Sequence, residues 1–87
     1  MPIGDRETLE ACYEAGRTGS FSISEHAHAR ARAEGHSPAD LRHALSNASR
    51  CARIDGQEGR WLIHGPSLDG TEVTLNVVLA GDTLSVV

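Results

Sequence analysis

The sequence predicts an α+β domain in which two to three N-terminal helices pack on a four-stranded antiparallel meander. Its first half carries apolar residues at helical spacing, bounded by residues that favour helix ends. Its second half alternates apolar and polar residues, which is typical of strands with one buried face. Glycine-containing turns separate these alternating segments, as expected between neighbouring antiparallel strands. Helices that precede strands in this way favour a helical layer on one side of a sheet.

The first predicted helix lies within residues 5–16. Leu9, Cys12 and Tyr13 are spaced i, i+3 and i+4, so they share one face of this helix. Gly16 is expected to end the helix because glycine disfavours helix interiors. A loop is expected to follow.

Residues 24–34 are predicted to form a helix, although alanine alternates with histidine or arginine through much of this segment. A strand with that alternation would bury almost nothing but alanine, whereas alanine has the highest helix propensity. Ser24 is a suitable N-cap and Gly35 a suitable stop. One stripe of this helix carries, at a spacing of four, His26, Arg30 and Glu34.

The third predicted helix has the clearest N-terminal signal. Ser37 can cap it, Pro38 suits its first turn, and Asp40 completes a capping box with aspartate in place of glutamate. Apolar residues then recur at i, i+3, i+4 and i+7, which predicts one buried face. They are Leu41, Ala44, Leu45 and Ala48.

Four strands are predicted, in residues 51–55, 60–65, 71–80 and 83–87. Because side chains alternate across a strand, one sheet face should pack against the helices. That face is expected to carry Trp61, Ile63, Val73, Leu75, Val77 and Leu79. The opposite face is expected to carry Arg60, Leu62, His64, Glu72, Thr74 and Asn76, joined by Arg53. This second face is either a ligand-binding surface or the ordinary solvated side of an antiparallel sheet.

Length and charge limit the function classes. The 87 residues are interpreted as a single domain, 1–87, with an N-terminal helix and loop at 1–21 and a core at 22–87. The formal net charge is −4, which argues against broad electrostatic binding to nucleic acid. One residue each of Phe, Trp and Tyr makes a thin core, so a protein partner or a homodimer fits this composition.

The sequence predicts a cytoplasmic protein. Its longest apolar run, near residues 75–80, is too short to span a bilayer, and no secretory segment is recognised. Cys12 and Cys51 are not in a CxxC arrangement. Both cysteines are therefore expected to be reduced, as packing residues or chance thiols rather than as a redox site.

Neither a metal nor a cofactor is expected. His26 and His28 form an HxH, but residues two apart on a helix point in different directions and are poorly placed to share a metal. The chain has no GxSxG motif and no phosphate-binding glycine loop.

Because these motifs are missing, general acid–base chemistry is the remaining option for catalysis. Histidine transfers protons near neutral pH, and arginine binds phosphate and stabilises its developing charge. The residue types for metal-free RNA cleavage are His26 with Arg30 on the helix, and His64 with Arg60 on the sheet. The alternative is that each pair belongs to an ordinary solvated surface or a helix cap.

A longer pattern, SxHAxxR…GxSxxDxxxAL, connects several of these residues. Its members are Ser24, His26, Ala27, Arg30, Gly35, Ser37, Asp40, Ala44 and Leu45. With the strands that follow, residues 22–87 resemble a small bacterial family of unknown function whose members are similar to RelE-type and MqsR-type toxins. The resemblance implies a RelE-like core, with two helices packed on a curved antiparallel sheet.

The resemblance also implies a function. The chain would be the toxin of a toxin–antitoxin pair, a metal-free endoribonuclease that acts on mRNA, often at the ribosome, with a cognate antitoxin as its partner. The candidate catalytic residues would be His26, Arg30, Arg60 and His64.

The alternative hypothesis is a non-catalytic protein-interaction module on the same fold, bound to another protein or to a second copy. The acidic charge favours this alternative, as does the lack of Arg, His and Tyr in residues 74–87. Ser24, Ala27 and His26 would then have structural roles, as a cap, a packing residue and a hydrogen-bonding residue.

Overall fold

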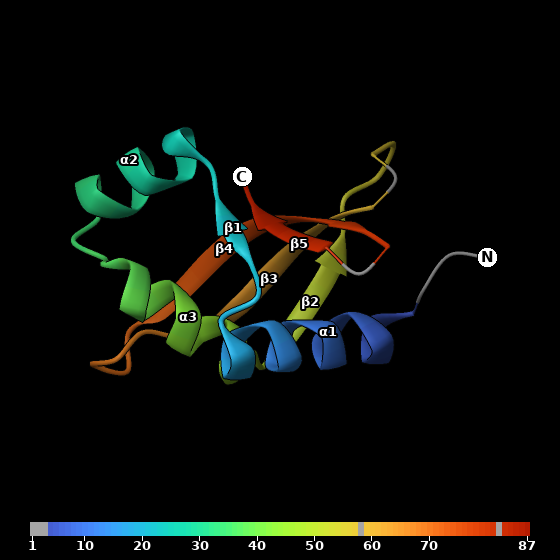
Figure 1. Ribbon diagram of the computed structural model, residues 1–87, viewed down its shortest axis with the longest axis horizontal. Helices are drawn as coiled ribbons and strands as arrows, with labels where there is room; N and C mark the ends of the chain where they lie inside the picture. Colours follow the sequence, from blue (N-terminus) through green and yellow to red (C-terminus); the bar gives the residue numbers. More distant parts are fainter. Residues whose placement is uncertain (1–3, 58, 82) are drawn as a thin grey trace.

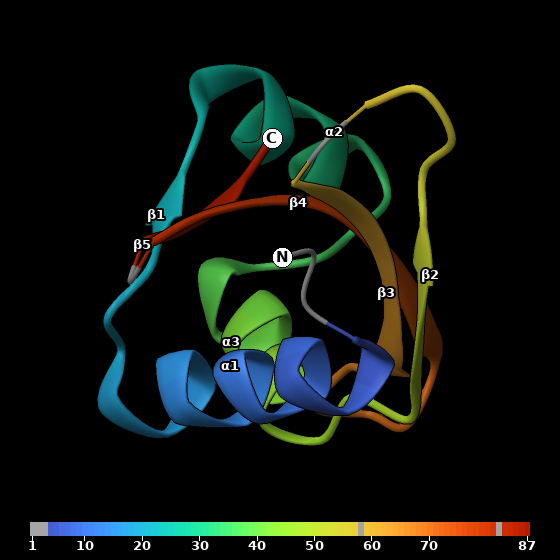
Figure 2. The same ribbon diagram turned by 90° about the vertical axis from the view of Figure 1, so that its right-hand side faces the viewer.

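The computed structural model describes residues 4–57, 59–81 and 83–87, and it has the predicted α+β order. This part of the chain contains three helices, α1 (Asp5–Thr18), α2 (Glu25–Ala33) and α3 (Pro38–Ser46). One sheet is formed by β1 (Ser22–Ile23), β2 (Arg50–Arg53), β3 (Arg60–Pro66), β4 (Glu72–Ala80) and β5 (Thr83–Val86). Figure 1 shows α1 and α3 along one side of the molecule and α2 apart from them. In Figure 2 the sheet arches over α1 and α3, and α2 lies above β4 in this view.

The strand order in this sheet is β1-β5-β4-β3-β2. The four predicted strands are antiparallel neighbours, as a meander requires. The prediction of a wholly antiparallel four-stranded sheet is nevertheless wrong, because β1 adds a short strand parallel to β5. A two-residue strand carries no alternation of its own, and its paired residues Ser22 and Ser85 lie 63 positions apart in the chain. Only the folded chain therefore identifies β1.

Helix α1 continues past Gly16, which corrects the predicted end of this helix. It ends at Thr18, and Gly19 in the left-handed conformation, with φ of 77°, forms the C-cap. Gly16 instead lies where α1 meets α3, because a Cβ atom there would be 2.3 Å from the Oγ atom of Ser46. The missing side chain at Gly16 therefore allows the two helices to approach closely.

Helices α2 and α3 begin where the sequence predicts. The Ser24 hydroxyl accepts a hydrogen bond of 3.0 Å from the backbone N–H of Ala27 at the start of α2. Ser37 and Asp40 form the reciprocal capping box of α3. Asp40 also accepts a bond of 3.0 Å from the backbone N–H of Leu68, in the loop before β4. Backbone hydrogen bonds from Ser37 and Leu68 lower the pKa of Asp40, so its carboxylate connects α3 to that loop.

The core lies between α1, α3 and the sheet face that they cover. The predicted apolar residues of the sheet are buried, namely Trp61, Ile63, Val73, Leu75 and Val77, whereas Leu79 is only partly buried. The predicted face of α3 is also buried, with Leu41, Ala44 and Leu45. Helix α2 adds two small buried side chains, Ala27 and Ala31. No helix within the described ranges is long and apolar enough to cross a bilayer.

Arg53 lies on the helix-facing side of the sheet, which corrects its predicted place on the outer face. It is paired with Trp61, and opposed residues on neighbouring antiparallel strands share a face. Its guanidinium carbon lies 5.1 Å from the centroid of the Trp61 ring. The same register places Arg50 beside His64 on the outer face.

Candidate functional site

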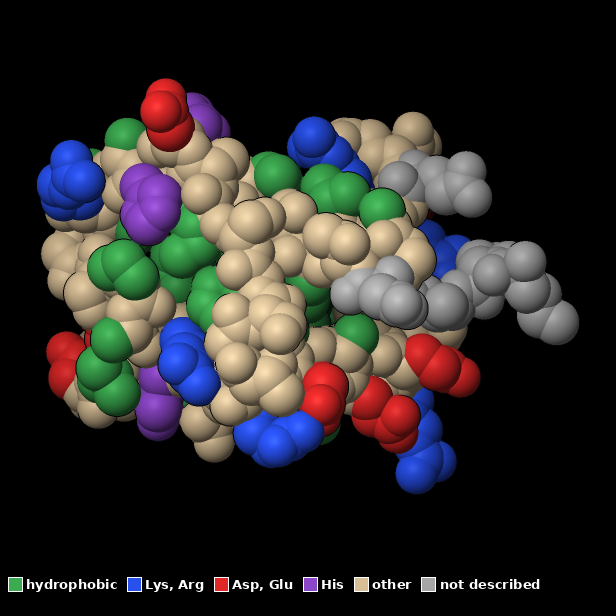
Figure 3. All heavy atoms as spheres, viewed as in Figure 1, with side chains coloured by type: hydrophobic (Ala, Val, Ile, Leu, Met, Phe, Trp, Pro, Cys, Tyr) green, Lys and Arg blue, Asp and Glu red, His purple; other side chains and the backbone are tan. Residues whose placement is uncertain are grey.

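A shallow groove opens between α2 and the first half of β4. Helix α2 and its C-cap residue contribute a face spaced i, i+3, i+4 and i+7, namely Ala27, Arg30, Ala31 and Glu34. Across the groove lie residues 73–76 of β4, and Leu41 and Val87 also contribute to its lining. The enclosed space is about 20 Å³, and the groove is otherwise open to solvent. Figure 3 shows hydrophobic side chains between arginine and histidine side chains over this part of the molecule.

The groove combines apolar walls with a charged rim. Ala27 and Ala31 are 6% and 8% exposed, and they form part of the apolar lining opposite β4. Arg30 and Glu34 are exposed, whereas His36 is partly buried at the end of the loop that follows α2. The rim therefore offers a cation and an anion to a ligand, above a floor that favours apolar groups.

In the part of the chain that the structure describes, half of β4 borders the groove without a neighbouring strand on that side. Strand β5 pairs only with Val77–Ala80, which is the second half of β4. Within the described residues, one further bond extends this ladder, from the backbone N–H of Val87 to the backbone oxygen of Asn76 at 2.8 Å. The residues of β4 before Asn76 therefore present an open strand edge to the groove.

A cluster of polar side chains lies on the outer face of the sheet, across β2, β3 and β4. His64 Nδ1 lies 3.2 Å from Thr74 Oγ1. Glu72 Oε1 lies 3.9 Å from His64 Nδ1 and 3.6 Å from Arg50 Nη2. The register explains this cluster, because His64 is paired with Arg50 on one side and with Thr74 on the other. A histidine, a carboxylate and a guanidinium together can transfer a proton and bind an anion.

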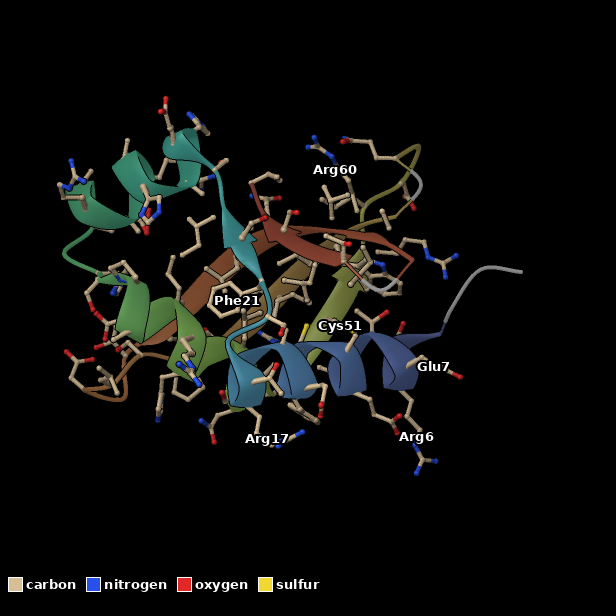
Figure 4. All side chains as sticks on the ribbon, in the orientation of Figure 1. Arg6, Glu7, Arg17, Phe21, Cys51 and Arg60 are labelled. Atoms are coloured by element: carbon tan, nitrogen blue, oxygen red, sulfur yellow. The ribbon has the colours of Figure 1, made fainter. Side chains whose placement is uncertain are left out.

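The structure divides the predicted catalytic residues between two elements. His26 and Arg30 are both exposed on α2, one turn apart, but only Arg30 lines the groove. His64 belongs to the outer-face cluster, and Thr74 connects that cluster to the groove because it contributes to both. Arg60 lies about 13 Å along β3 from His64, opposite Val78. Figure 4 shows Arg60 beside the loop between β2 and β3, well away from α2.

Two residues at these places are missing from the sequence-based prediction of the site. His36 lines the groove, and its only signal in the sequence is its position just after the glycine that ends α2. Arg50 joins the outer-face cluster because β2 begins one residue earlier than predicted. The face of Arg50 depends on strand register, which the local sequence pattern did not determine.

The two cysteines are poor nucleophiles. Burial raises the pKa of Cys12 to about 12, with a smaller contribution from Cys51. Burial, followed by the carboxylate of Asp5, also raises the pKa of Cys51. Cys51, which Figure 4 shows near α1, donates a hydrogen bond of 3.4 Å to the backbone oxygen of Asp5. Because the thiolate is the reactive form of cysteine, neither thiol is suited to nucleophilic catalysis at neutral pH.

The described residues contain no group of three or more His, Cys, Asp or Glu side chains placed to hold a metal ion. His26 and His28 differ in environment, with His26 exposed and His28 partly buried.

Comparison of this chain with protein-family models, with curated proteins and with solved structures found no match. The resemblance of residues 22–87 to RelE-type and MqsR-type toxins is thus a hypothesis that rests on the sequence pattern.

Proposed function

We propose that this chain is a non-catalytic protein-interaction module that binds a partner in the groove between α2 and β4. The observation that carries the proposal is the position of this groove, which combines apolar walls with the open half of β4. A polypeptide can use both features, because its side chains can pack against the apolar walls while its backbone forms hydrogen bonds with the strand edge.

Charge and the arrangement of polar residues support a protein partner. The net charge of −4 disfavours a phosphate backbone as the ligand. The rim of the groove carries Arg30 and Glu34, so it presents both signs of charge. The candidate catalytic residues lie on α2 and at two separate places on β3, which favours binding over concerted proton transfer.

A purely structural role for α2 is the alternative explanation of this arrangement. A helix that covers an open strand protects it from pairing with other chains. Full protection would require a tight contact, whereas α2 faces β4 with Ala27 and Ala31 and leaves the groove between them. The open space therefore favours a site for a partner.

Filling the groove is expected to abolish binding of a peptide ligand. Random linear dodecapeptides displayed on phage would be selected against the folded protein, and the selected peptides measured by fluorescence polarisation. Ala31→Leu puts a larger side chain into the groove, so affinity is expected to fall about tenfold or more. Ala29→Leu makes the same change at an exposed position of α2 outside the groove lining and is expected to leave affinity unchanged.

Two results would contradict the proposal. The first is a selection that yields no binding peptide. The second is a set of peptides whose affinities respond equally to Ala31→Leu and Ala29→Leu, because those peptides would bind elsewhere. Circular dichroism of both variants confirms that each is folded before its affinity is compared.

The endoribonuclease of the toxin hypothesis is the second candidate function, and the outer-face cluster is the observation that favours it. Glu72 can accept the proton of a ribose 2′-hydroxyl, His64 can donate a proton to the leaving oxygen, and Arg50 can bind the phosphate. Their spacing of 3.6 to 3.9 Å around Glu72 Oε1 places all three groups in one cluster. In this hypothesis His26 and Arg30 would lie on α2, outside the reacting cluster.

This second function predicts cleavage of a fluorescent RNA oligonucleotide that persists in EDTA. His64→Gln is expected to lower the rate about 100-fold because it removes the proton donor. His28→Gln, on α2, is the matched control and is expected to retain the rate. In cells the active chain would arrest growth, and an antitoxin encoded next to it would relieve the arrest. Normal growth together with intact RNA would exclude this function.

A further inference from the structure

The hydrogen-bonding directions along β4 identify what its open edge can bind. In an antiparallel ladder, the N–H and C=O of one residue face the same neighbour, and successive residues face opposite neighbours. The N–H of Leu79 donates to the oxygen of Gly59, next to β3, at 2.8 Å. The oxygen of Asn76 accepts from the N–H of Val87, after β5, at 2.8 Å. The backbone N–H and C=O groups of the odd-numbered residues of β4 therefore point to β3. Those of the even-numbered residues point to the side of β5.

Two residues of β4 consequently direct their backbone groups to the open side. They are Thr74 and Glu72, which continue the even-numbered series beyond Asn76. In the described part of the chain, no strand is paired with them there, because β5 and Val87 reach only as far as Asn76. Thr74 also lines the groove, so its N–H and C=O lie at the proposed binding site.

We propose that the partner enters the groove as an extended strand, antiparallel to β4 and in line with β5, and bonds to the backbone of Thr74. This inference rests on the proposed interaction function and specifies how the partner is bound. A strand supplies donors and acceptors at the spacing that an open edge requires, which a helix cannot do because its own backbone groups are already paired.

The register also defines the side chains that such a strand needs. Residues of the added strand that face Leu75 and Val73 would place their side chains on the helix-facing side, against the apolar lining of the groove. The residue that faces Thr74 would place its side chain on the outer side, where Thr74 contacts His64. The partner segment is therefore expected to alternate apolar and polar residues.

A tethered strand tests the edge without knowledge of the natural partner. In one version of the protein, Val-Thr-Val-Thr follows Val87 directly, so its second residue faces Thr74. Amide hydrogen exchange of Thr74, followed by NMR, is expected to slow about tenfold when that N–H becomes hydrogen-bonded. With Val-Pro-Val-Thr, the second residue cannot donate to the backbone oxygen of Thr74, and its ring occupies the place of that hydrogen. The added strand is then expected to separate from β4, so most of the protection of the Thr74 N–H is expected to be lost.

The matched control is Pro-Thr-Val-Thr, in which the proline replaces an N–H that faces away from β4. It is expected to retain the protection of Thr74. Unchanged exchange at Thr74 in all three versions would overturn strand addition, as would equal protection with proline at either position.

The two proposals can fail separately. If Ala31→Leu abolishes peptide binding but the tethered strand leaves Thr74 unprotected, the groove binds a partner by some other means and only strand addition fails. If both hold, the selected peptides are also expected to bind about tenfold more weakly to the Val-Thr-Val-Thr version, because the tether occupies their site.

Discussion

Replacing Gly65 with alanine is expected to destabilise the fold by about 3 kcal/mol or more, because the added methyl group has no room. Gly65 is buried in β3, and a Cβ atom there would lie 2.2 Å from the backbone oxygen of Ala44 and 3.1 Å from its Cα atom. Those atoms belong to the backbone of α3, so relief would require the whole helix to move away from the sheet. Small domains are stable by only about 5–15 kcal/mol, so much of the stability would be lost.

The measurement is a urea denaturation curve for the wild type and each variant. Gly4→Ala is the control, because a Cβ atom at Gly4 meets only the flexible side chain of Glu7. Adding Ala44→Gly to Gly65→Ala is expected to give no rescue, since the obstacle is the backbone of residue 44 rather than its methyl group. A Gly65→Ala variant with wild-type stability would contradict the close contact between the backbone of α3 and β3.

The second large effect is expected for Trp61→Ala, at about 3–5 kcal/mol. Trp61 lies on β3, is 2% exposed, and is the one tryptophan of the sequence. Its removal would leave a cavity in the core beside β3, next to its paired residue Val77. The guanidinium of Arg53 would also lose the aromatic face that it covers.

Circular dichroism during thermal and urea unfolding is the appropriate measurement, because Trp61→Ala removes the fluorescent side chain. Leu62→Ala is the matched control, since Leu62 is the next residue of β3 and is only partly buried on the other face. A loss of about 1 kcal/mol or less is expected there. Equal losses for both substitutions would contradict the assignment of the two faces of β3.

Local signals in the sequence predicted the parts of the fold that depend on neighbouring residues. Ser24 and the Ser37–Asp40 box identified the starts of α2 and α3, because capping involves residues three positions apart. Alternation of side chains identified the buried face of β3 and β4, with Trp61 and Val77 among its members. These features need no knowledge of the distant chain.

Features that depend on distant pairings were predicted incorrectly or not at all. The sequence predicts Gly16 at a helix end, whereas its role in the contact with α3 depends on Ser46, 30 positions away. The predicted face of Arg53 is wrong, and Arg50 has no predicted role. Both errors arise because the pairing of β2 with β3 sets the register of these residues. The candidate site differs from the prediction for the same reason, since His64 contacts Thr74 on the outer face, Arg30 lines the groove, and Arg60 lies apart from both.

The sequence by itself determined the α+β class, the helix starts and the apolar sheet face, because each follows from the period or the capping chemistry of a short segment. Only the tertiary structure decided that β1 adds a parallel strand, that Arg50, His64 and Glu72 meet, and that half of β4 stays open beside α2. Strand register and edge pairing are physical properties of segments that meet in space, so no local pattern could specify them.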